Sequence, residues 1–336
     1  MKISAWAAPK ASSGLEPFAY EAAPLGASDV EIRISHCGIC HSDLHLINND
    51  WGSSRYPLVP GHEIIGTVVR MGAAVQHLKA GQRVGVGWQR SSCGECEYCR
   101  RGEENLCDRK QATCVGHHGG FAAAIVTDSR LVFPIPEALD SADAAPLLCA
   151  GITVYSPLKR HGVGSGMRVG MIGIGGLGHL GLQFAAKLGA EVTALSSTAA
   201  KEQDARRLGA TGFLDTTDAG ALQRARRSLD FILSTVNVDL PWGAYLKLLR
   251  PNGILCFVGV SPSGLGLSAD DLIGGQKTLT GSTIGGSAMM MDMLAFAANH
   301  QVAARIETRP MAEVNAALER VARNQARYRM VLENPA

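Results

Sequence analysis

The sequence predicts an α/β protein in two parts, a mostly β part before about residue 150 and a doubly wound parallel sheet after it. Short β-like runs separated by glycine and proline occupy the first part, whereas strand-like and helix-like segments alternate in the second. At 336 residues and 46% hydrophobic side chains, the chain can bury the cores of two domains. Its 39 glycines are typical of a fold with many tight turns and close backbone approaches.

The predicted helices and strands follow from apolar runs and from the glycine and proline residues that separate them. In the first part, the runs Val30 to Ser35, Ile64 to Arg70 and Arg83 to Gly87 predict strands. The second part predicts, in order, a strand over 167–173, a helix over 177–188, a strand over 191–195, a helix over 199–208, a strand over 230–234, a helix over 240–249 and a strand over 253–258. The end of the chain predicts helices over 289–299 and 311–323 and a strand over 328–332, and periodicity leaves their packing open.

Charge and hydropathy exclude several classes of partner. The net charge is +2 and the basic residues are scattered apart from short runs such as Arg224 to Arg227, so we expect neither a nucleic acid nor an acidic membrane as partner. No stretch reaches the 18 or so apolar residues of a membrane span, and the N-terminus does not read as a signal peptide. We expect a soluble, cytoplasmic protein with reduced thiols.

Four cysteines lie close together in the first part, as Cys93-x2-Cys96-x2-Cys99-x7-Cys107. Four thiolates from one loop suit a tetrahedral structural Zn²⁺, which has no open position and performs no chemistry. An iron–sulfur ligand run would have a shorter last spacing followed by proline, whereas Asp108 follows here. A disulfide framework would need an exported protein, and the cysteine count of nine is odd. The cluster therefore predicts structural zinc.

A glycine-rich loop joins the first predicted strand and helix of the second part, and its residues are Gly173, Ile174, Gly175, Gly176, Leu177 and Gly178. In this context Gly173 allows a tight turn, Gly175 lets the backbone approach a pyrophosphate, and Gly178 lets helix and strand pack closely. The free N–H groups at the start of the helix then face the phosphate charge. The loop predicts a dinucleotide site, and the alternative is a plain turn between a strand and a helix.

The choice of dinucleotide depends on the end of the second strand. An NAD site would place an acidic residue there for the ribose 2′-hydroxyl, but no acid occurs between Glu191 and Glu202. The segment instead offers hydroxyls and one amino group that can bind a 2′-phosphate, from Ser196, Ser197, Thr198 and Lys201. We therefore predict NADP(H). The same residues could cap the next helix, with Ser197 or Thr198 as N-cap, and both roles are compatible.

Three scattered residues, Cys40, His62 and Cys149, suggest a second metal centre. Two thiolates and one imidazole form a three-ligand zinc site that leaves the fourth position for water or a substrate oxygen. Each residue also has a simpler interpretation, for example Cys149 as a small buried apolar side chain. From spacing alone both interpretations stay open.

Taken together, the motifs resemble the zinc-dependent medium-chain dehydrogenases over almost the whole chain. The resemblance rests on the order and spacing of the four-cysteine loop, the glycine loop, Cys40-His41-Ser42-Asp43, Gly61-His62-Glu63 and Cys149-Ala150-Gly151-Ile152-Thr153. Three further stretches resemble the cinnamyl-alcohol-dehydrogenase group, namely 56–63, 196–201 and 234–238. Asn49-Asp50-Trp51-Gly52 and Gly87-Trp88 are similar to its bacterial broad-specificity NADPH-dependent aldehyde reductases.

The resemblance implies a GroES-like catalytic domain over 1–150, completed by 285–336, and a Rossmann NADP(H)-binding domain over 151–284, with the active site in the cleft between them. It implies two zinc ions per chain, one structural and one catalytic, the latter held by Cys40, His62 and Cys149. Glu63 would lie behind the catalytic ion and approach it during ligand exchange, and Asp43 would orient His62. Cys37, Cys114 and Cys256 match no ligand position. A homodimer through the edge of the Rossmann sheet is also implied.

The resemblance also implies residues that contact the cofactor, transfer a proton and line the substrate pocket. Residues that resemble contacts to the cofactor ribose and nicotinamide are Thr153, Thr235, Gly259, Ser282, Thr283 and Ile284. Ser42 would touch the cofactor ribose and pass a proton through it towards His45, and a relay by water stays open. Trp51 and Trp88 would line the substrate pocket, the alternative being that both are core tryptophans.

The expected function is hydride transfer between NADP(H) and aldehydes or primary alcohols of aromatic or medium-chain aliphatic type, as an aldehyde reductase. One alternative is the same machinery acting as a polyol or secondary-alcohol dehydrogenase. A second is a zinc-stabilised NADPH-binding protein without turnover, which the intact three-ligand set and Ser42 argue against, because a pure binder needs neither.

Overall fold

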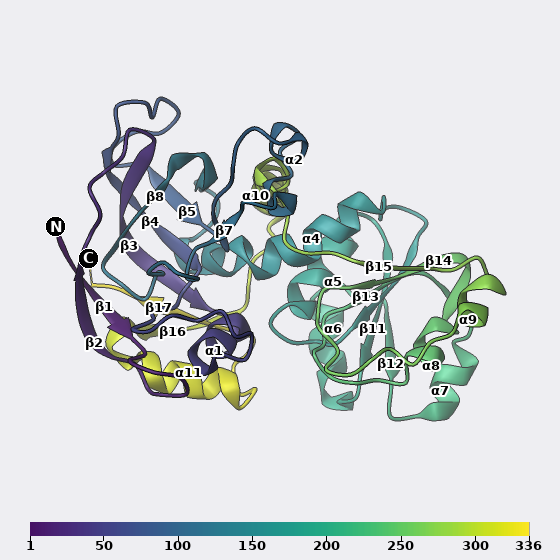
Figure 1. The fold of residues 1–336 in the computed structure, drawn as a ribbon. Coiled ribbons are helices and arrows are strands. Elements are labelled where there is room, and N and C mark those ends of the chain that lie inside the picture. The colour runs from purple at the N-terminus through teal and green to yellow at the C-terminus, as the bar shows by residue number, and fades with distance from the viewer. Residues whose placement is uncertain (336) are drawn as a thin grey trace. The chain divides into compact units, whose positions relative to one another are not determined.

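The computed structural model describes residues 1–335 and divides the chain into two compact units (Figure 1). The first unit consists of Met1–Ile152 together with the chain from Gly285 onward, and the second is Thr153–Ile284. Within the described residues, no helix is both long and apolar enough to cross a membrane.

A seven-stranded sheet forms the centre of the first unit. Its main path is β16-β17-β3-β4-β5-β9, and β8 pairs with β3. The strands are β3 Asp29–Ile39, β4 Glu63–Met71, β5 Arg83–Val86, β8 Ala124–Asp128, β9 Val132–Pro134, β16 Ile306–Pro310 and β17 Arg329–Glu333. Because β17 pairs antiparallel with β3, the end of the chain is an integral part of the sheet that the beginning of the chain forms.

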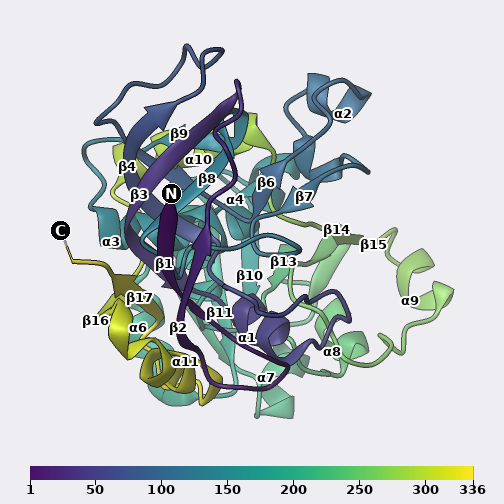
Figure 2. The ribbon, with the colours of Figure 1, turned by 60° about the vertical axis from the view of Figure 1, so that its left-hand side comes forward.

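Smaller elements surround this sheet. Two short strand pairs are β1 Lys2–Ala7 with β2 Glu16–Glu21 and β6 Gln89–Ser91 with β7 Gln111–Ala112. The helices of this unit are α1 His41–Asn48, α2 Glu97–Arg100, α3 Ser141–Ala144, α10 Ser287–His300 and α11 Val314–Ala322, with 3₁₀ turns η1 Glu104–Leu106, η2 Ser129–Leu131, η3 Ala145–Leu148 and η5 Met311–Glu313. Figure 2 shows α11 beside β16 and β17, and it buries Val314, Ala317, Leu318 and Val321, the spacing of one helical face.

The second unit contains a six-stranded parallel sheet with the order β12-β11-β10-β13-β14-β15 (Figure 1). Its strands are β10 Arg168–Ile172, β11 Glu191–Ser196, β12 Gly212–Asp215, β13 Leu229–Ser234, β14 Leu249–Phe257 and β15 Thr278–Gly281. The helical elements are α4 Ala150–Arg160, which begins just before this unit, α5 Gly178–Lys187, η4 Ala199–Lys201, α6 Glu202–Arg207, α7 Ala219–Arg224, α8 Trp242–Leu246 and α9 Ala269–Ile273. This strand order is that of a doubly wound Rossmann fold, whose order reverses between β10 and β13.

Most predicted elements are confirmed within one or two residues, and five are corrected. The strand predicted over Val30 to Ser35 continues to Ile39, and the helix predicted over 311–323 begins as a 3₁₀ turn, with α11 starting at Val314. The helix predicted over 199–208 is a 3₁₀ turn followed by the shorter α6. The helix predicted over 240–249 covers only Trp242–Leu246, because Leu249 already pairs with Leu229 as the first residue of β14. For the same reason, the strand predicted over 253–258 begins four residues earlier, at Leu249.

A pair of hydrogen bonds ties the last part of the chain to the first. The Asn315 Oδ1 atom accepts from Leu15 N at 2.8 Å, and Asn315 Nδ2 donates to Leu15 O at 2.9 Å. Asn315→Ala should therefore destabilise the first unit by about 1–3 kcal/mol, since two backbone groups lose their partner. Urea unfolding followed by tryptophan fluorescence measures this change, because Trp6, Trp51 and Trp88 lie in the first unit and only Trp242 lies in the second.

Asn299→Ala is the matched control for this substitution. Asn299 is exposed on α10, so its removal should change the free energy of unfolding by less than about 0.5 kcal/mol. An Asn315→Ala protein as stable as this control would show that the amide does not hold the two ends of the chain together.

Candidate active site and metal centres

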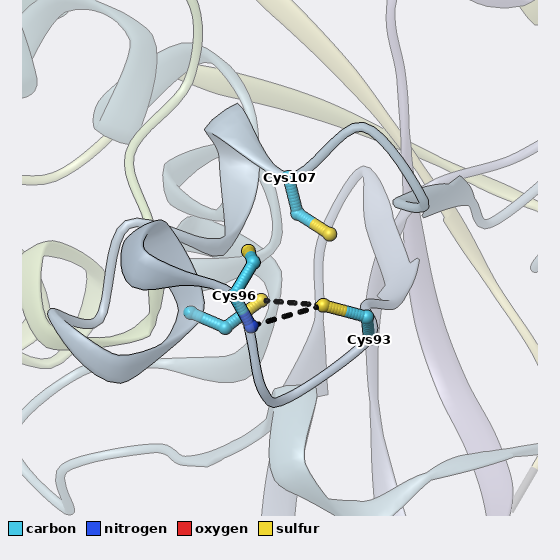
Figure 3. A group of neighbouring side chains, drawn as sticks. Cys93, Cys96 and Cys107 are labelled. Atoms are coloured by element: carbon cyan, nitrogen blue, oxygen red, sulfur yellow. Dashed lines mark hydrogen bonds between the residues drawn. The ribbon is translucent and has the colours of Figure 1, made fainter.

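The four-cysteine loop forms a compact sulfur cluster, which we call the four-cysteine lobe (residues 93–107). The sulfur atoms of Cys93, Cys96, Cys99 and Cys107 all lie within 4.8 Å of one another. Cys93 Sγ lies 3.8 Å from Cys99 Sγ and accepts from Cys96 N at 3.3 Å, and Figure 3 shows the labelled side chains turned towards a common centre. Zn–S bonds of about 2.3 Å in a tetrahedron place sulfurs about 3.8 Å apart. The lobe therefore fits a tetrahedral zinc ion.

The local fold explains how one loop brings four sulfurs together. Cys96 is the N-cap of α2 and Cys99 lies within this helix, so one helical turn places both on the same side. Cys107 follows directly after the 3₁₀ turn η1, which returns the chain to the cluster. The backbone N–H of Cys96 donates to a sulfur, which favours the thiolate form of that ligand.

A second group of metal-binding side chains is buried in the first unit. Its members are Cys40, His62, Glu63 and Cys149, and their ligand atoms lie within 4.8 Å of one another. His62 Nε2 lies 3.3 Å from Cys149 Sγ, and Cys40 Sγ lies 3.6 Å from the Ser42 hydroxyl. The structure thus brings Cys40, His62 and Cys149 together, although Cys40 and Cys149 are more than 100 positions apart in the chain. Two sulfurs and one imidazole suit zinc.

Asp43 fixes the orientation of the His62 ring. The Asp43 Oδ1 atom lies 3.1 Å from His62 Nδ1 and accepts from Gly61 N at 2.9 Å. The other oxygen, Oδ2, accepts from Cys40 N at 2.8 Å. A proton on Nδ1 shared with the carboxylate leaves the Nε2 lone pair of His62 free for a cation. This geometry agrees with the orienting role that the resemblance implies for Asp43.

Glu63 forms a buried ion pair with Arg329 of β17, a residue that the sequence analysis did not single out. One carboxylate oxygen pairs with the guanidinium, and the other, Oε2, is buried without a hydrogen-bond partner. Burial raises the pKa of the Glu63 carboxyl to about 7, although the adjacent Arg329 charge lowers it. A buried carboxylate oxygen with no partner beside two thiols and an imidazole fits a bound cation.

The pKa directions do not separate the ligand thiols from the other buried thiols, because the hydrogen bond with Cys40 raises the pKa of the Cys149 thiol well above its ordinary value. A hydrogen bond with Cys149 lowers the pKa of the Cys40 thiol well below its ordinary value. Burial instead raises the pKa of Cys37 and Cys114, and raises that of Cys256 to about 11. The Cys114 sulfur nevertheless lies within 4.8 Å of the ligand atoms of Asp43 and His62, although no motif of the sequence links it to them.

Four aromatic rings extend from the metal site. Trp88 packs edge-on against His62, with ring centroids 4.8 Å apart, and Trp51 packs edge-on against Trp88 at 6.1 Å. The His45 ring lies 5.2 Å from Trp51, and His45 Nδ1 lies 2.7 Å from Asp50 Oδ2. Trp51 is 50% exposed and is therefore not a core residue. No role is predicted for Asp50 from the sequence, and the structure shows it as the partner of His45.

The glycine loop of the second unit has the geometry of a dinucleotide-binding turn. Gly173 adopts φ of +90°, a conformation that favours glycine, and a Cβ on Gly178 would overlap the carbonyl of Gly173. A Cβ on Gly175 would meet nothing within 4 Å, so the backbone there is open to a ligand. α5 begins at Gly178 and places its free N–H groups behind the loop. The loop fits a pyrophosphate group.

The residues predicted for the 2′-phosphate lie at the end of β11 and in the turn that follows. Lys201 Nζ donates to the Ile174 carbonyl at 2.9 Å, so its amino group reaches the glycine loop from the neighbouring turn. Ser196 Oγ accepts from Thr198 N at 3.1 Å. Thr198 occupies the N-cap position of η4, one of the two residues expected there, but its side chain makes no capping hydrogen bond.

Apart from Ser42, which lies on α1 in the first unit, the other predicted cofactor residues also lie in the second unit. Thr235 Oγ1 donates to the Ile172 carbonyl at 2.9 Å, next to the glycine loop. Gly259 N donates to Ser234 O at 3.3 Å and Ser282 N to Phe257 O at 3.0 Å, which places both residues at the carboxyl ends of the strands. Thr283 and Ile284 follow Ser282, and Thr153 lies within α4. Ligands of doubly wound sheets bind at this edge.

Comparison with known proteins agrees with this architecture. The sequence model of the alcohol dehydrogenase GroES-like domain matches residues 26–137, and that of the zinc-binding dehydrogenase domain matches residues 176–299. Aldehyde reductase AdhA of Synechocystis sp. (strain ATCC 27184 / PCC 6803 / Kazusa) is 42% identical over 332 residues, 99% of both chains.

Solved structures give the same result. The cinnamyl alcohol dehydrogenase SbCAD4 of Sorghum bicolor superposes with a TM-score of 0.95 at 40% identity, over 99% of this chain and 98% of the other. The cinnamyl alcohol dehydrogenase of Helicobacter pylori, solved with NADP(H), has a TM-score of 0.92 at 33% identity and the same coverage. The class is that of the alcohol and aldehyde oxidoreductases. Within it the chain belongs to the zinc-dependent medium-chain alcohol dehydrogenases, in the cinnamyl-alcohol-dehydrogenase-like group.

Proposed function

We propose that this protein is an NADPH-dependent aldehyde reductase with two zinc ions per chain, acting on aromatic and medium-chain aliphatic aldehydes. The observation that carries the proposal is the three-ligand set of Cys40, His62 and Cys149, with a tryptophan ring against the imidazole and a hydroxyl beside a sulfur. The similarity to an aldehyde reductase and to an enzyme solved with NADP(H) supports the reaction and the cofactor.

The four-cysteine lobe holds the structural ion, and Cys40, His62 and Cys149 hold the catalytic one. Glu63 keeps one oxygen without a hydrogen-bond partner beside the catalytic ligands, which supports the exchangeable role that the resemblance implies. When bound, zinc polarises a carbonyl oxygen and stabilises the negative charge that grows on it, while NADPH supplies the hydride. Asp43 keeps the imidazole in the tautomer that can bind the ion.

Ser42 and His45 transfer the proton between the reacting oxygen and solvent. The Ser42 hydroxyl lies 3.6 Å from Cys40 Sγ, next to where the negative charge develops. His45 lies three residues further along α1, with 34% of its side chain exposed, so it can exchange protons with solvent. Asp50 holds His45 Nδ1 at 2.7 Å, which leaves Nε2 as the exchanging position.

Ser42→Ala should lower kcat about 100-fold, because the hydroxyl that holds the proton is lost while the metal ligands remain. Zinc content, measured by atomic absorption, should stay at two ions per chain. Ser53→Ala, an exposed serine of the same unit, is the matched control and should leave kcat unchanged. A normal kcat for Ser42→Ala would rule out this proton path, and one zinc ion per chain in the parent protein would contradict the two-metal proposal.

Selectivity for NADPH over NADH rests on Ser196, Ser197, Thr198 and Lys201. The Lys201 amino group donates to the Ile174 carbonyl, which supports a positive charge held beside the phosphate-binding loop. Hydroxyl groups at the end of β11 can donate to a 2′-phosphate, whereas a carboxylate there would repel it.

Ser196→Asp should lower the ratio of kcat/KM for NADPH to that for NADH by at least about tenfold, since the new carboxylate repels the 2′-phosphate and accepts from a 2′-hydroxyl. Steady-state kinetics with both cofactors measure this ratio. Gln223→Glu adds the same charge on an exposed position of α7 and should leave the ratio unchanged. Equal ratios in the parent and the Ser196→Asp variant would place the 2′-phosphate elsewhere.

The substrate class follows from the tryptophans. Trp88 presents a flat apolar surface beside His62, and Trp51 extends it towards solvent. Such walls suit flat aromatic or extended aliphatic aldehydes and discriminate weakly among related chains. We therefore expect a broad specificity.

The decisive experiment is the initial rate of NADPH oxidation with cinnamaldehyde on zinc-replete protein, beside an NADH control. Fast, NADPH-dependent turnover is the expected result, because the ligand set and the tryptophan surface favour an aldehyde next to zinc. Turnover confined to secondary alcohols or polyols would indicate a dehydrogenase of those substrates. No turnover with any of them, together with a single metal ion per chain, would indicate a non-catalytic NADPH-binding protein.

A homodimer and a cytoplasmic location complete the proposal. β15 lies at the end of the six-stranded sheet, so its outer edge has no neighbour within the described part of the chain. Val260 and Ile273, which precede β15 in the second unit, are 78% and 70% exposed, and a second copy at this edge would cover apolar surface of this kind. All nine cysteines are free of disulfides, which suits a reducing compartment.

A further inference from the structure

Glu104 connects the four-cysteine lobe to α10. It lies three residues before Cys107, at the start of η1. Its Oε2 accepts from Ser287 N at 2.8 Å, and its Oε1 accepts from the Ser287 hydroxyl at 2.7 Å. Ser287 is the first residue of α10, and the N-cap position before it is Gly286, which has no side chain to cap the helix. The lobe therefore supplies the cap, and the negative charge suits the helix N-terminus.

Close backbone packing accompanies these hydrogen bonds. A Cβ on Gly286 would overlap the carbonyl oxygen of Gly102, and a Cβ on Gly102 would lie 2.9 Å from the Cβ of Ala288. The lobe and the first turn of α10 are thus in direct contact at two glycines. This contact fixes where α10 begins relative to the four sulfurs.

Beyond its first turn, α10 packs against the segments that carry the catalytic ligand Cys149 and the tryptophan Trp88. Met290 is buried, and its Cε lies 3.4 Å from the position of a Cβ on Gly87, the residue before Trp88. The Leu148 carbonyl, directly before Cys149, lies 2.6 Å from the same position.

A second methionine of α10 lies beside the segment that carries Cys149. Met293 is fully buried, and its sulfur lies 3.4 Å from the position of a Cβ on Gly151, two residues after Cys149. Met290 and Met293 lie three residues apart and so share one face of α10. The helix therefore packs against both segments, with Met290 beside Gly87 before Trp88 and Met293 beside Gly151 after Cys149.

We propose that Glu104 is a positioning residue that couples the two metal centres, with the lobe holding α10 and α10 holding Cys149 and Trp88. Glu104 acts through the helix, because its carboxylate binds Ser287 and none of the catalytic ligands. The proposal rests on the two-metal function proposed above. Under this proposal the four-cysteine lobe affects aldehyde binding, although the metal of the lobe has no open position for a substrate.

The experiment uses the full chain with Co²⁺ in the three-ligand site, which reports ligand geometry in its visible spectrum. Glu104→Ala should shift the Co²⁺ absorption bands and raise the KM for cinnamaldehyde about threefold to tenfold, since α10 loses both cap bonds and no longer holds Cys149 and Trp88 in place. The KM for NADPH should stay unchanged. Glu104→Gln keeps oxygen and shape but loses the charge, so it should rescue most of the spectrum and of the KM.

Glu103→Ala is the matched control. Glu103 is the neighbouring acid, and it pairs on the surface with Arg101. Its removal takes the same charge from the lobe and should change neither the spectrum nor the KM.

A Glu104→Ala protein with a lower Tm but an unchanged Co²⁺ spectrum and unchanged KM would overturn the coupling and leave Glu104 with a role in stability alone. If that variant does not fold, Ser287→Ala decides the matter, because it removes one of the two bonds and should shift the spectrum and the KM in the same direction by a smaller amount. The spectrum needs no turnover, so an inactive parent protein would contradict the proposed function, whereas a spectrum indifferent to both substitutions contradicts the coupling.

Discussion

β3 pairs antiparallel with β4 on one side and with β17 on the other, and this pairing determines where the proposed metal ligands lie. Gly38 of β3 lies opposite Glu63, and Ile39 lies opposite Met330. β3 ends at Ile39 and β4 begins at Glu63, so the residues just beyond these ends, Cys40 and His62, meet at one edge of the sheet. A shift of one residue in this register would turn the side chains of the strand to the opposite face and separate the ligands.

The same pairing accounts for the electrostatics of the site. Buried charges are costly unless they are paired, and the site contains two carboxylates and several thiols with almost no exposure. Asp43 satisfies its oxygens with two backbone N–H groups and an imidazole, and Glu63 pairs with Arg329. Arg329 can reach Glu63 only because β17 lies beside β3. The strand that ends the chain therefore stabilises the carboxylate nearest the metal ligands.

Sequence reasoning located the parts of the site that are local in the chain. The four-cysteine lobe and the glycine loop are each encoded within fifteen residues or fewer, and their spacing carries the chemistry directly. Arg329 and Glu104 were missed because their partners are 266 and 183 residues away, and no spacing rule relates such positions. The lengths of α6 and α8 were also missed, since their ends depend on strand pairing and on a 3₁₀ turn rather than on helical periodicity.

Trp88 and Cys149 lie where two kinds of constraint meet. On one side, the ring of Trp88 rests on His62, and the sulfur of Cys149 lies 3.3 Å from the same imidazole. On the other side, Gly87 before Trp88 and Gly151 two residues after Cys149 lie beside methionines of α10. Protein interiors are close-packed. A displacement of the first turn of α10 is therefore transmitted to these neighbouring residues. The four-cysteine lobe can therefore influence the proposed catalytic site, because Glu104 holds the helix that packs against that site.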